Sequence, residues 1–161
     1  MIFIAIGSNL ESKEHGSPEE NCKAAIKVLK ENFYVEKISK FYKTEPIPKS
    51  DQPWFVNVVI SVKTEFSPEQ ILRILLSIEA NFKRERKKKN EARVIDLDLL
   101  SYNNKVLNSK NLTLPHPRMH LRKFVIKPLC DIDNEWKHPR LKKKAKIILK
   151  ELALQKIMNI N

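Results

Sequence analysis

Two helix starts of the same design constrain the fold of this chain more than any other feature of its sequence. Ser17-Pro18-Glu19-Glu20 is a capping box with proline at the first helical position, and Ser67-Pro68-Glu69-Gln70 repeats the design about fifty residues later. Apolar residues recur at helical spacing after each start, which predicts two amphipathic helices, the first over about residues 18–32. The apolar positions are Cys22, Ala25, Ile26, Leu29 and Phe33 in the first helix, and Ile71, Ile74, Leu75, Ile78 and Phe82 in the second.

Apolar runs on both sides of the first helix predict strands. Ile2–Ile6 suits a buried strand that ends at the turn-forming triplet Gly7-Ser8-Asn9. Residues 35–44 and 55–64 have the composition of two further strands, separated by a proline-rich loop. Gly7 is one of only two glycines, and either a plain turn or a contact with a ligand accounts for it. Strands and helices in this order indicate a βαβ–βαβ arrangement, without a true internal repeat.

One pair of side chains in the strand over residues 55–64 suggests a binding role. Val56, Val58 and Ile60 share one face of that strand, and Phe55 and Asn57 therefore share the other. An aromatic ring beside an amide could stack on a heterocycle and hydrogen-bond its edge. Because asparagine is depleted from strands, a role for Asn57 is favoured, although a structural amide is an equal alternative.

A second short strand carries two carboxylates. Asp96 and Asp98 lie two residues apart in an apolar run, so both point to one face while Ile95, Leu97 and Leu99 point to the other. Two carboxylates held side by side repel each other unless a cation lies between them, and hard oxygen ligands suit Mg²⁺. The alternative is a strand with one solvated face.

A basic run lies immediately before these carboxylates. Arg84, Arg86 and Arg93 have planar guanidinium groups that match phosphate oxygens in a bidentate way. A solvated loop is the ordinary explanation of such a run. Arginines for phosphate next to carboxylates for metal are nevertheless the equipment of phosphoryl-type transfer from a nucleotide. Later in the chain, His116, Arg118 and Arg122 lie close together in the sequence and suggest an anion site.

Length and composition set the remaining bounds. The chain has 161 residues, which predicts one domain, and its net charge of +12 predicts anionic partners. Cys22 and Cys130 are too few for a disulfide framework, so we expect reduced cysteines in the cytoplasm. We expect neither a membrane span nor a signal peptide. A module that binds RNA on its sheet is a rival hypothesis, but the aromatic pattern that it requires is missing.

Five blocks of sequence resemble one enzyme family. They are IAIGSNL, FYKTEPI, DQPWFVNVVI, EARVIDLDLL and LPHPRMHLRKFVIKPL, in this order. Their order and spacing resemble the 6-hydroxymethyl-7,8-dihydropterin pyrophosphokinases. The resemblance implies an α+β fold with a ferredoxin-like core, an antiparallel sheet with helices packed on it, in a single pyrophosphokinase domain over residues 1–161. It also implies transfer of the β,γ-diphosphate of ATP to the hydroxymethyl group of the reduced pterin, with release of AMP, in folate biosynthesis.

The resemblance also implies roles for particular residues. Two Mg²⁺ ions on the triphosphate would be held by Asp96 and Asp98. Catalytic roles are implied for Arg84, Arg86, Arg93 and His116, and ATP contacts for Arg84, Arg93, Leu99, Thr113, His116 and Arg122. The pterin pocket would comprise Thr44, Glu45, Ile47, Phe55, Asn57 and Phe124, with two aromatic rings on either side of the pterin and Glu79 nearby.

One stretch departs from the family pattern. Glu91 and Ala92 stand where members commonly have glycine and then proline or alanine. An inactive relative with the same fold is therefore the second rival hypothesis, although both aspartates are intact. We expect a monomer that binds ATP and a reduced pterin and binds neither nucleic acid nor membrane.

Overall fold

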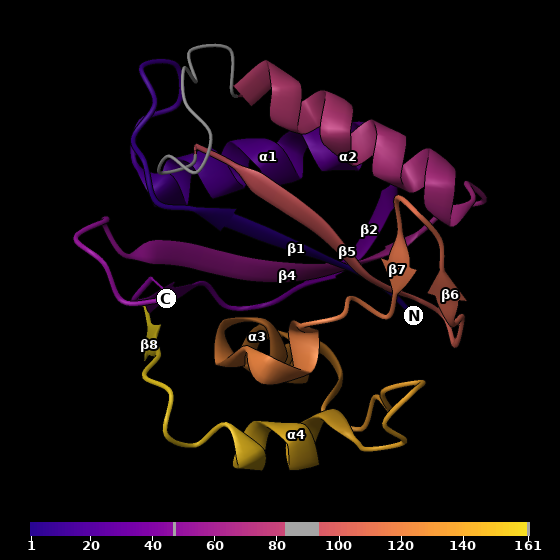
Figure 1. Cartoon of the computed structure of the whole chain (residues 1–161). Coiled ribbons are helices and arrows are strands. Elements are labelled where there is room, and N and C mark those ends of the chain that lie inside the picture. Colours follow the sequence, from indigo (N-terminus) through magenta and orange to yellow (C-terminus); the bar gives the residue numbers. More distant parts are fainter. Residues whose placement is uncertain (47, 83–93, 161) are drawn as a thin grey trace.

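The computed structural model describes residues 1–46, 48–82 and 94–160 (Figure 1). Within these residues, six strands form one antiparallel sheet in the order β5-β1-β4-β3-β8, and β2 also pairs with β4. The elements in chain order are β1 (Ile2–Ser8), α1 (Pro18–Asn32), β2 (Tyr34–Ile38), β3 (Tyr42–Thr44), β4 (Phe55–Lys63), α2 (Pro68–Phe82), β5 (Asp96–Tyr102), β6 (Leu107–Asn108), β7 (Thr113–Leu114), the 3-10 helix η1 (Met119–Leu121), α3 (Lys123–Asp133), α4 (Ala145–Glu151) and β8 (Met158–Asn159).

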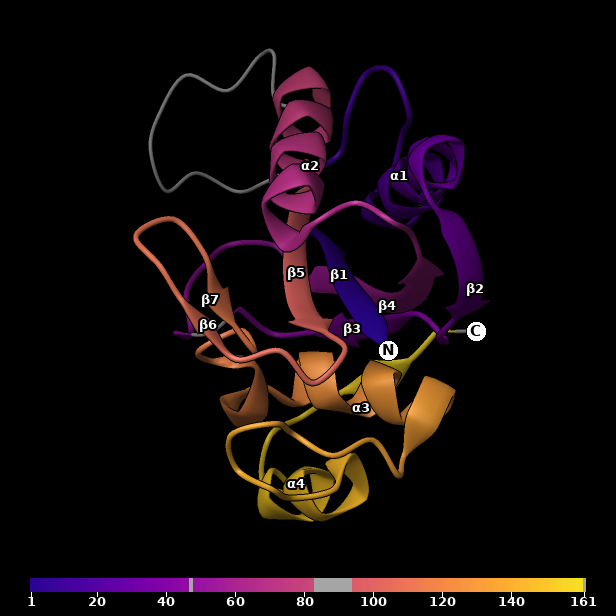
Figure 2. The same cartoon turned by 90° about the vertical axis from the view of Figure 1, so that its right-hand side faces the viewer.

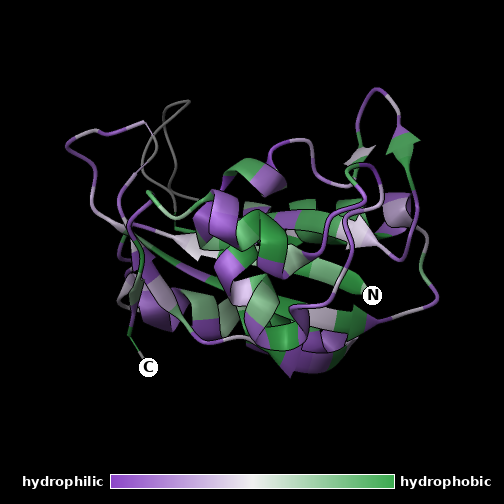
Figure 3. Cartoon of the chain, turned by 90° about the horizontal axis from the view of Figure 1, so that it is seen from below, coloured by the Kyte–Doolittle hydropathy of each residue, from purple (hydrophilic) through white to green (hydrophobic). Residues whose placement is uncertain are grey.

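Helices cover both faces of the sheet and create two separate cores. Helices α1 and α2 lie on one face, and α3 lies on the other face with α4 packed on its outer side (Figures 1 and 2). The first core contains the inward faces of α1 and α2, and the second contains residues such as Phe3, Val59 and Ile126. The helices on the α3 side of the sheet, seen from below in Figure 3, show both apolar and polar residues, as amphipathic packing requires. This arrangement confirms the predicted α+β class and the antiparallel sheet.

The two predicted helix starts are present. Ser17 Oγ accepts the Glu20 backbone N–H at 3.2 Å, and Glu20 Oε2 accepts the Ser17 N–H at 3.3 Å. The second start repeats this reciprocal pattern, with N–H to oxygen distances of 3.2 and 2.8 Å between Ser67 and Gln70. Each pair satisfies backbone donors that the first turn of a helix leaves without partners. Every helix in the described ranges is too short or too polar to span a bilayer.

The strand predicted over residues 35–44 is in fact two strands. β2 and β3 both pair with β4, and residues 39–41 interrupt the ladder between them. At the interruption Ser39 bonds to Val59 through its backbone N–H and also accepts the Val59 N–H on its hydroxyl, both at 2.9 Å. The Ser39 hydroxyl thus takes the place of a backbone carbonyl, so the Val59 N–H keeps a partner where the ladder is interrupted.

A buried histidine in the loop between α3 and α4 makes stability sensitive to acid. The His138 side chain is 2% exposed, and its Nδ1 accepts the backbone N–H groups of Arg140 and Leu141 at 3.2 and 3.1 Å. Burial, and to a smaller extent the neighbouring His120 and Arg140, lowers the pKa of His138 to about 4. The folded protein therefore holds a neutral ring at pH values where the unfolded chain binds a proton.

The free energy of unfolding is expected to fall as the pH drops from about 6.5 to about 4, because only the unfolded chain takes up the His138 proton in that range. Above the unfolded pKa this contribution is fully present. Its loss amounts to about 3 kcal/mol by pH 4. His138→Asn keeps an acceptor for the two N–H groups without titrating, so urea denaturation of the variant should show a flatter dependence on pH. Parallel pH curves for the two proteins would contradict this assignment.

Candidate active site

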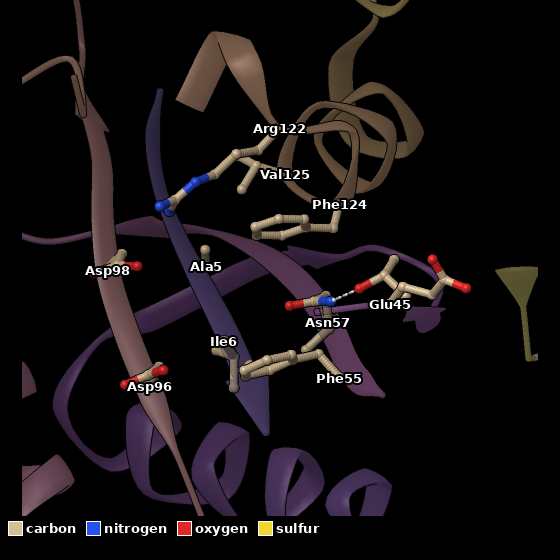
Figure 4. A pocket seen from close by; sticks show the side chains of 13 residues that line it. Ala5, Ile6, Glu45, Phe55, Asn57, Asp96, Asp98, Arg122, Phe124 and Val125 are labelled. Carbon is tan, nitrogen blue, oxygen red and sulfur yellow. Dashed lines mark hydrogen bonds between the residues drawn. The ribbon is translucent and has the colours of Figure 1, made fainter. Parts of the chain in front are cut away.

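A cavity of about 160 Å³ lies between one end of the sheet and the start of α3 (Figure 4). Four strands and one helix contribute to it, which brings together residues from the beginning, middle and end of the chain. The residues that line it are Ala5, Ile6, Gly7, Thr44, Glu45, Phe55, Asn57, Val58, Asp96, Asp98, Arg122, Phe124 and Val125.

The two aspartates of β5 lie on the cavity side of the sheet. Ile95, Leu97 and Leu99 are buried in the core on the opposite side, where α1 and α2 pack. The alternation of β5 therefore sends Asp96 and Asp98 toward the cavity together, as predicted, and Figure 4 shows both carboxylates along the same side of the strand.

Small residues face these carboxylates from the neighbouring strand. Asp98 is the cross-strand partner of Ala5, and Asp96 is the partner of Gly7. Gly7 is also paired on its other side with Asn57 of β4. A Cβ atom on Gly7 would lie 3.0 Å from Asn57 Oδ1, which is closer than ordinary contact. Because Ala5 has a small side chain and Gly7 has none, the cavity stays open between the carboxylates and the amide.

An amide and two aromatic rings form the other end of the cavity. Phe55 of β4 and Phe124 of α3 lie on opposite sides, with the Asn57 side chain between their levels (Figure 4). Asn57 Nδ2 donates to Thr44 Oγ1 at 2.8 Å, and this bond fixes the orientation of the amide. Its Oδ1 remains over Gly7 as an acceptor. The arrangement can hold a flat heterocycle by stacking and by hydrogen bonding at its edge.

Arg122 enters the cavity from the residue that precedes α3. Its side chain extends toward Asp98 in Figure 4, and its guanidinium carbon lies 5.5 Å from the centre of the Phe124 ring. Burial lowers the pKa of Arg122 and the nearby Arg118 acts in the same direction, while Asp98 and then Asp96 oppose the shift. Arg122 is therefore a half-buried cation beside the carboxylate pair, in a suitable place for phosphate.

His116 lies near Asp98 and Arg122, and its neutral ring can donate a hydrogen bond. Its backbone N–H donates to Leu100 O at 2.8 Å, and its Nδ1 accepts the Arg118 N–H at 3.2 Å. Burial is the largest influence and lowers the pKa of His116, Asp98 opposes this, and Arg122 adds to it. Because Nδ1 is an acceptor, the neutral ring carries its proton on Nε2. That N–H can donate to an anionic ligand.

Glu79 supports the strand that carries the aspartates. It lies near the end of α2, and its Oε2 accepts the backbone N–H of Leu97 at 2.8 Å. Leu97 stands between Asp96 and Asp98, and β5 is the outermost strand of the sheet on this side. A carboxylate on another element thus satisfies a donor that the edge of the sheet leaves open. The family resemblance indicated an acidic residue near the site, but sequence spacing gave no sign of this bond.

Replacing Glu79 by alanine is expected to lower the free energy of unfolding by about 1.5–3 kcal/mol, because the Leu97 N–H loses a charged acceptor. Urea denaturation followed by circular dichroism would measure the loss. Glu79→Gln is the matched control, since it retains an oxygen acceptor and should recover most of the stability. Equal stabilities for the two variants would contradict a structural role of this bond.

Asn9, which the sequence indicated only as part of a turn, supports the proline-rich loop. It is buried, and its Nδ2 donates to Gln52 Oε1 at 3.1 Å and to Pro53 O at 3.2 Å. These bonds connect the end of β1 to the residues just before Phe55. They therefore help to fix where the aromatic wall of the cavity begins.

Other predicted site residues lie outside the cavity lining. Thr113 is in β7, which packs against β5. The Leu99 side chain is 4% exposed and lies in the core shared with α1 and α2, so a contact with ATP would have to come from its backbone. The remaining predicted residues, Ile47, Arg84, Arg86 and Arg93, lie outside the residues that the structure describes.

The carboxylate pair suits a magnesium ion that takes its other ligands from elsewhere. Within residues 1–46, 48–82 and 94–160, no group of three or more histidine, cysteine, aspartate or glutamate side chains could hold a metal. Mg²⁺ is usually bound by one or two carboxylates together with water and substrate phosphates. Asp96 and Asp98, above the small Ala5 and Gly7, fit that requirement.

Comparisons with known proteins identify the family of this chain. The family model of the 7,8-dihydro-6-hydroxymethylpterin-pyrophosphokinases matches residues 3–134. The 2-amino-4-hydroxy-6-hydroxymethyldihydropteridine pyrophosphokinase of Haemophilus influenzae is 36% identical over 161 residues, covering 99% of this chain and 97% of that protein. The protein of the same name from Bacillus subtilis is 34% identical over 134 residues, covering 82% of this chain and 77% of that one.

Parts of larger proteins are also similar to this chain. The folic acid synthesis protein fol1 of Pneumocystis carinii is 39% identical over 138 residues, and the match covers 86% of this chain but 18% of that protein. A crystal structure of Plasmodium falciparum HPPK-DHPS with pteroate has a TM-score of 0.75 at 14% identity, and it covers 93% of this chain and 44% of that one. This chain thus spans less than half of those longer proteins, and the structural likeness confirms the fold. The resemblance inferred from sequence is confirmed, and the chain belongs to the 7,8-dihydro-6-hydroxymethylpterin-pyrophosphokinase family.

Proposed function

We propose that residues 1–161 act as a single pyrophosphokinase domain of folate biosynthesis. It transfers the β,γ-diphosphate of ATP to the hydroxymethyl group of 6-hydroxymethyl-7,8-dihydropterin and releases AMP. The strongest support is that one cavity contains both the carboxylate pair and a slot formed by Phe55, Phe124 and Asn57. The slot and the carboxylates lie on either side of Gly7. Family membership supports the same reaction.

The pterin occupies the slot between Phe55 and Phe124. Stacking on two rings suits a flat heterocycle, and Asn57 Oδ1 accepts a hydrogen bond from its nitrogen edge. Thr44 and Glu45 line the outer side of the same slot. In this orientation the hydroxymethyl group points along the floor toward Asp96. The slot therefore supplies orientation, which accounts for a large share of catalysis in reactions between two bound substrates.

The triphosphate occupies the end of the cavity near β5. Asp96 and Asp98 would hold two Mg²⁺ ions, which would supply positive charge beside the phosphates. Arg122, the Nε2–H of His116 and Thr113 contact phosphate oxygens or the nucleotide. The pterin contact predicted for Ile47 stays a hypothesis, since this residue lies outside the described ranges. The catalytic roles predicted for Arg84, Arg86 and Arg93, which precede β5 in the sequence, stay a hypothesis.

The protein itself needs to supply no nucleophile, because the pterin hydroxyl attacks the β-phosphorus. Phosphoryl-type transfer depends on positioning and on stabilising charge rather than on covalent catalysis. Water is a competing acceptor, so residues that exclude it from the cavity also matter. The aromatic walls formed by Phe55 and Phe124 serve this purpose in addition to binding.

A product assay tests the proposal. The protein is mixed with MgATP and 6-hydroxymethyl-7,8-dihydropterin, and AMP is separated from ADP. AMP that forms only in the presence of the pterin supports diphosphate transfer. ADP would indicate an ordinary kinase on the same scaffold. No turnover by protein shown to be folded would indicate an inactive relative, with Glu91 the first residue to change.

The Phe55→Ala variant is expected to bind the pterin about tenfold more weakly and to bind an ATP analogue as the wild type does, because it removes one stacking wall and leaves the carboxylates in place. Calorimetry with each ligand measures both affinities. Phe66→Ala is the control, since Phe66 is a partly exposed ring near the start of α2, away from the cavity. Equal losses for both ligands would place Phe55 outside the pterin site.

Two further properties complete the proposal. We propose a cytoplasmic enzyme that works as a monomer, with ATP and the reduced pterin as its substrates. Cys22 and Cys130 are both free thiols, which agrees with a reducing compartment. Sedimentation velocity at micromolar concentration would test the monomer.

A further inference from the structure

The segment after α4 returns to the active-site side of the molecule. The backbone turns at Leu152, and Gln155 N donates to Leu152 O at 3.1 Å. The chain then runs to β8, which pairs with β3 through Lys43 and Tyr42. Residues 152–160, called the C-terminal strap from here on, therefore connect α4 to the outer edge of the sheet. The family match ends at residue 134, well before the strap.

Gln155 connects the strap to the backbone on both sides of Arg122. Its Nε2 donates to Leu121 O at 2.8 Å, and its Oε1 accepts the Lys123 backbone N–H at 2.9 Å. Both polar atoms of the Gln155 amide are thus hydrogen-bonded. The nitrogen bonds to the residue before Arg122, and the oxygen bonds to the residue after it. Two bonds of opposite direction fix the position and the orientation of that short stretch.

These bonds perform the task of a helix cap. The first N–H groups of a helix have no partner within the helix, and the residue before it often supplies a side-chain acceptor. Arg122 precedes α3 and makes no such cap, because a guanidinium group has no hydrogen-bond acceptor; its side chain extends toward Asp98 instead. Gln155 satisfies the first N–H of α3 from a different element. Arg122 is thereby available to the cavity while the helix start stays defined.

The fixed stretch carries one wall of the pterin slot. Phe124 is the residue after Lys123, and its ring lines the active-site cavity. The same residue also lines a second cavity, together with Leu154, Gln155 and Lys156 of the strap. Phe124 therefore lies between the pterin slot and the space beside the strap, so the position of the ring depends on the backbone stretch that Gln155 holds.

The other end of the strap pairs with the strand that orients Asn57. β8 pairs with β3, and β3 ends at Thr44, whose hydroxyl accepts the Asn57 amide. The strap thus joins the start of α3, which carries Phe124, to the strand that orients Asn57. The strap is therefore hydrogen-bonded both to the stretch that carries Phe124 and to the strand that orients Asn57.

We propose that Gln155 is a positioning residue for the pterin. It holds the Arg122–Phe124 stretch so that the Phe124 ring faces Phe55 at the separation that a stacked heterocycle needs. It acts through backbone atoms and touches no substrate. This role rests on the proposed pterin pyrophosphokinase function.

The test compares Gln155→Met with Leu154→Ala. Methionine has nearly the shape of glutamine and makes neither hydrogen bond, while Leu154 is a fully exposed neighbour in the same turn. Steady-state AMP formation gives KM for the pterin and kcat, and hydrogen exchange followed by NMR gives the protection of the Lys123 amide. For Gln155→Met we expect KM for the pterin to rise about tenfold with kcat nearly unchanged, and the Lys123 amide to exchange faster. Leu154→Ala should match the wild type in all three.

The outcomes separate this role from the proposed function itself. A wild type that makes no AMP would refute the function, and the Lys123 amide would then still report whether Gln155 holds the helix start. An active wild type with an unchanged pterin KM in Gln155→Met would overturn the positioning role, even if the variant melts at a lower temperature. Unchanged protection of the Lys123 amide would overturn it as well.

Discussion

The Asp98→Asn variant is expected to form AMP on the order of a hundred to a thousand times more slowly than the wild type. Asparagine keeps the shape of the side chain and removes the negative charge that the carboxylate pair offers to a cation. Asp98 is an exposed side chain on a strand whose other face is buried, so the fold should persist. Rates of AMP formation under saturating substrates, together with thermal melting, measure both properties.

A control variant and a metal titration sharpen this prediction. Asp51→Asn removes an equal charge from the exposed proline-rich loop and should leave the rate unchanged. Titration with Mg²⁺ should show that Asp98→Asn needs a higher metal concentration for half of its remaining activity, because one of two carboxylate ligands is lost. Wild-type turnover in the variant would exclude a role for Asp98 in holding the metal.

The Gly7→Ala variant is expected to lose about two- to tenfold in pterin affinity with little loss of stability. Its Cβ would lie 3.0 Å from Asn57 Oδ1, so the amide must move away from the position fixed by Thr44. A displaced acceptor weakens a hydrogen bond to the ligand, and each such bond contributes about 0.5–1.5 kcal/mol. The smaller conformational freedom of alanine in the unfolded chain offsets part of the strain. Calorimetry with the pterin gives the affinity, and urea denaturation gives the stability.

A double-mutant cycle identifies the cause of the Gly7→Ala effect. If the new methyl group acts by displacing Asn57, then Gly7→Ala should cost much less pterin affinity when Asn57 is already alanine. Residues in direct contact commonly show such non-additive effects. Additive losses would instead mean that the methyl group obstructs the pterin directly, independently of the amide.

Local patterns were sufficient to predict the parts of the site that lie within one strand. The apolar residues Ile95, Leu97 and Leu99 required one face of β5 to be buried, so the side of Asp96 and Asp98 followed from a period of two. The same reasoning paired Phe55 with Asn57 on the cavity side of β4. Both helix starts followed from their capping residues, since a cap involves only four consecutive positions.

Features that depend on distant parts of the chain could not be predicted from patterns. No periodicity indicates that α3 lies on the face opposite α1 and α2, so the placement of Phe124 and Arg122 came from the family resemblance. The carboxylate of Glu79 on Leu97 N and the amide of Gln155 on Lys123 N join residues that are 18 and 32 positions apart. The break between β2 and β3 depends on a serine that bonds across to Val59, and a propensity scale would not detect it.

The position of Gly7 between two strands determines how far apart the substrates can lie. Asn57 and Asp96 are the partners of Gly7 on its two sides. Neighbouring strands are spaced by about 4.8 Å, so the amide and the nearest carboxylate belong to strands roughly 10 Å apart. Backbone hydrogen bonds set this separation, and it is therefore independent of the surrounding loops. Loops of different length around the cavity can thus change how quickly substrates enter or leave without changing the distance across which the diphosphate is transferred.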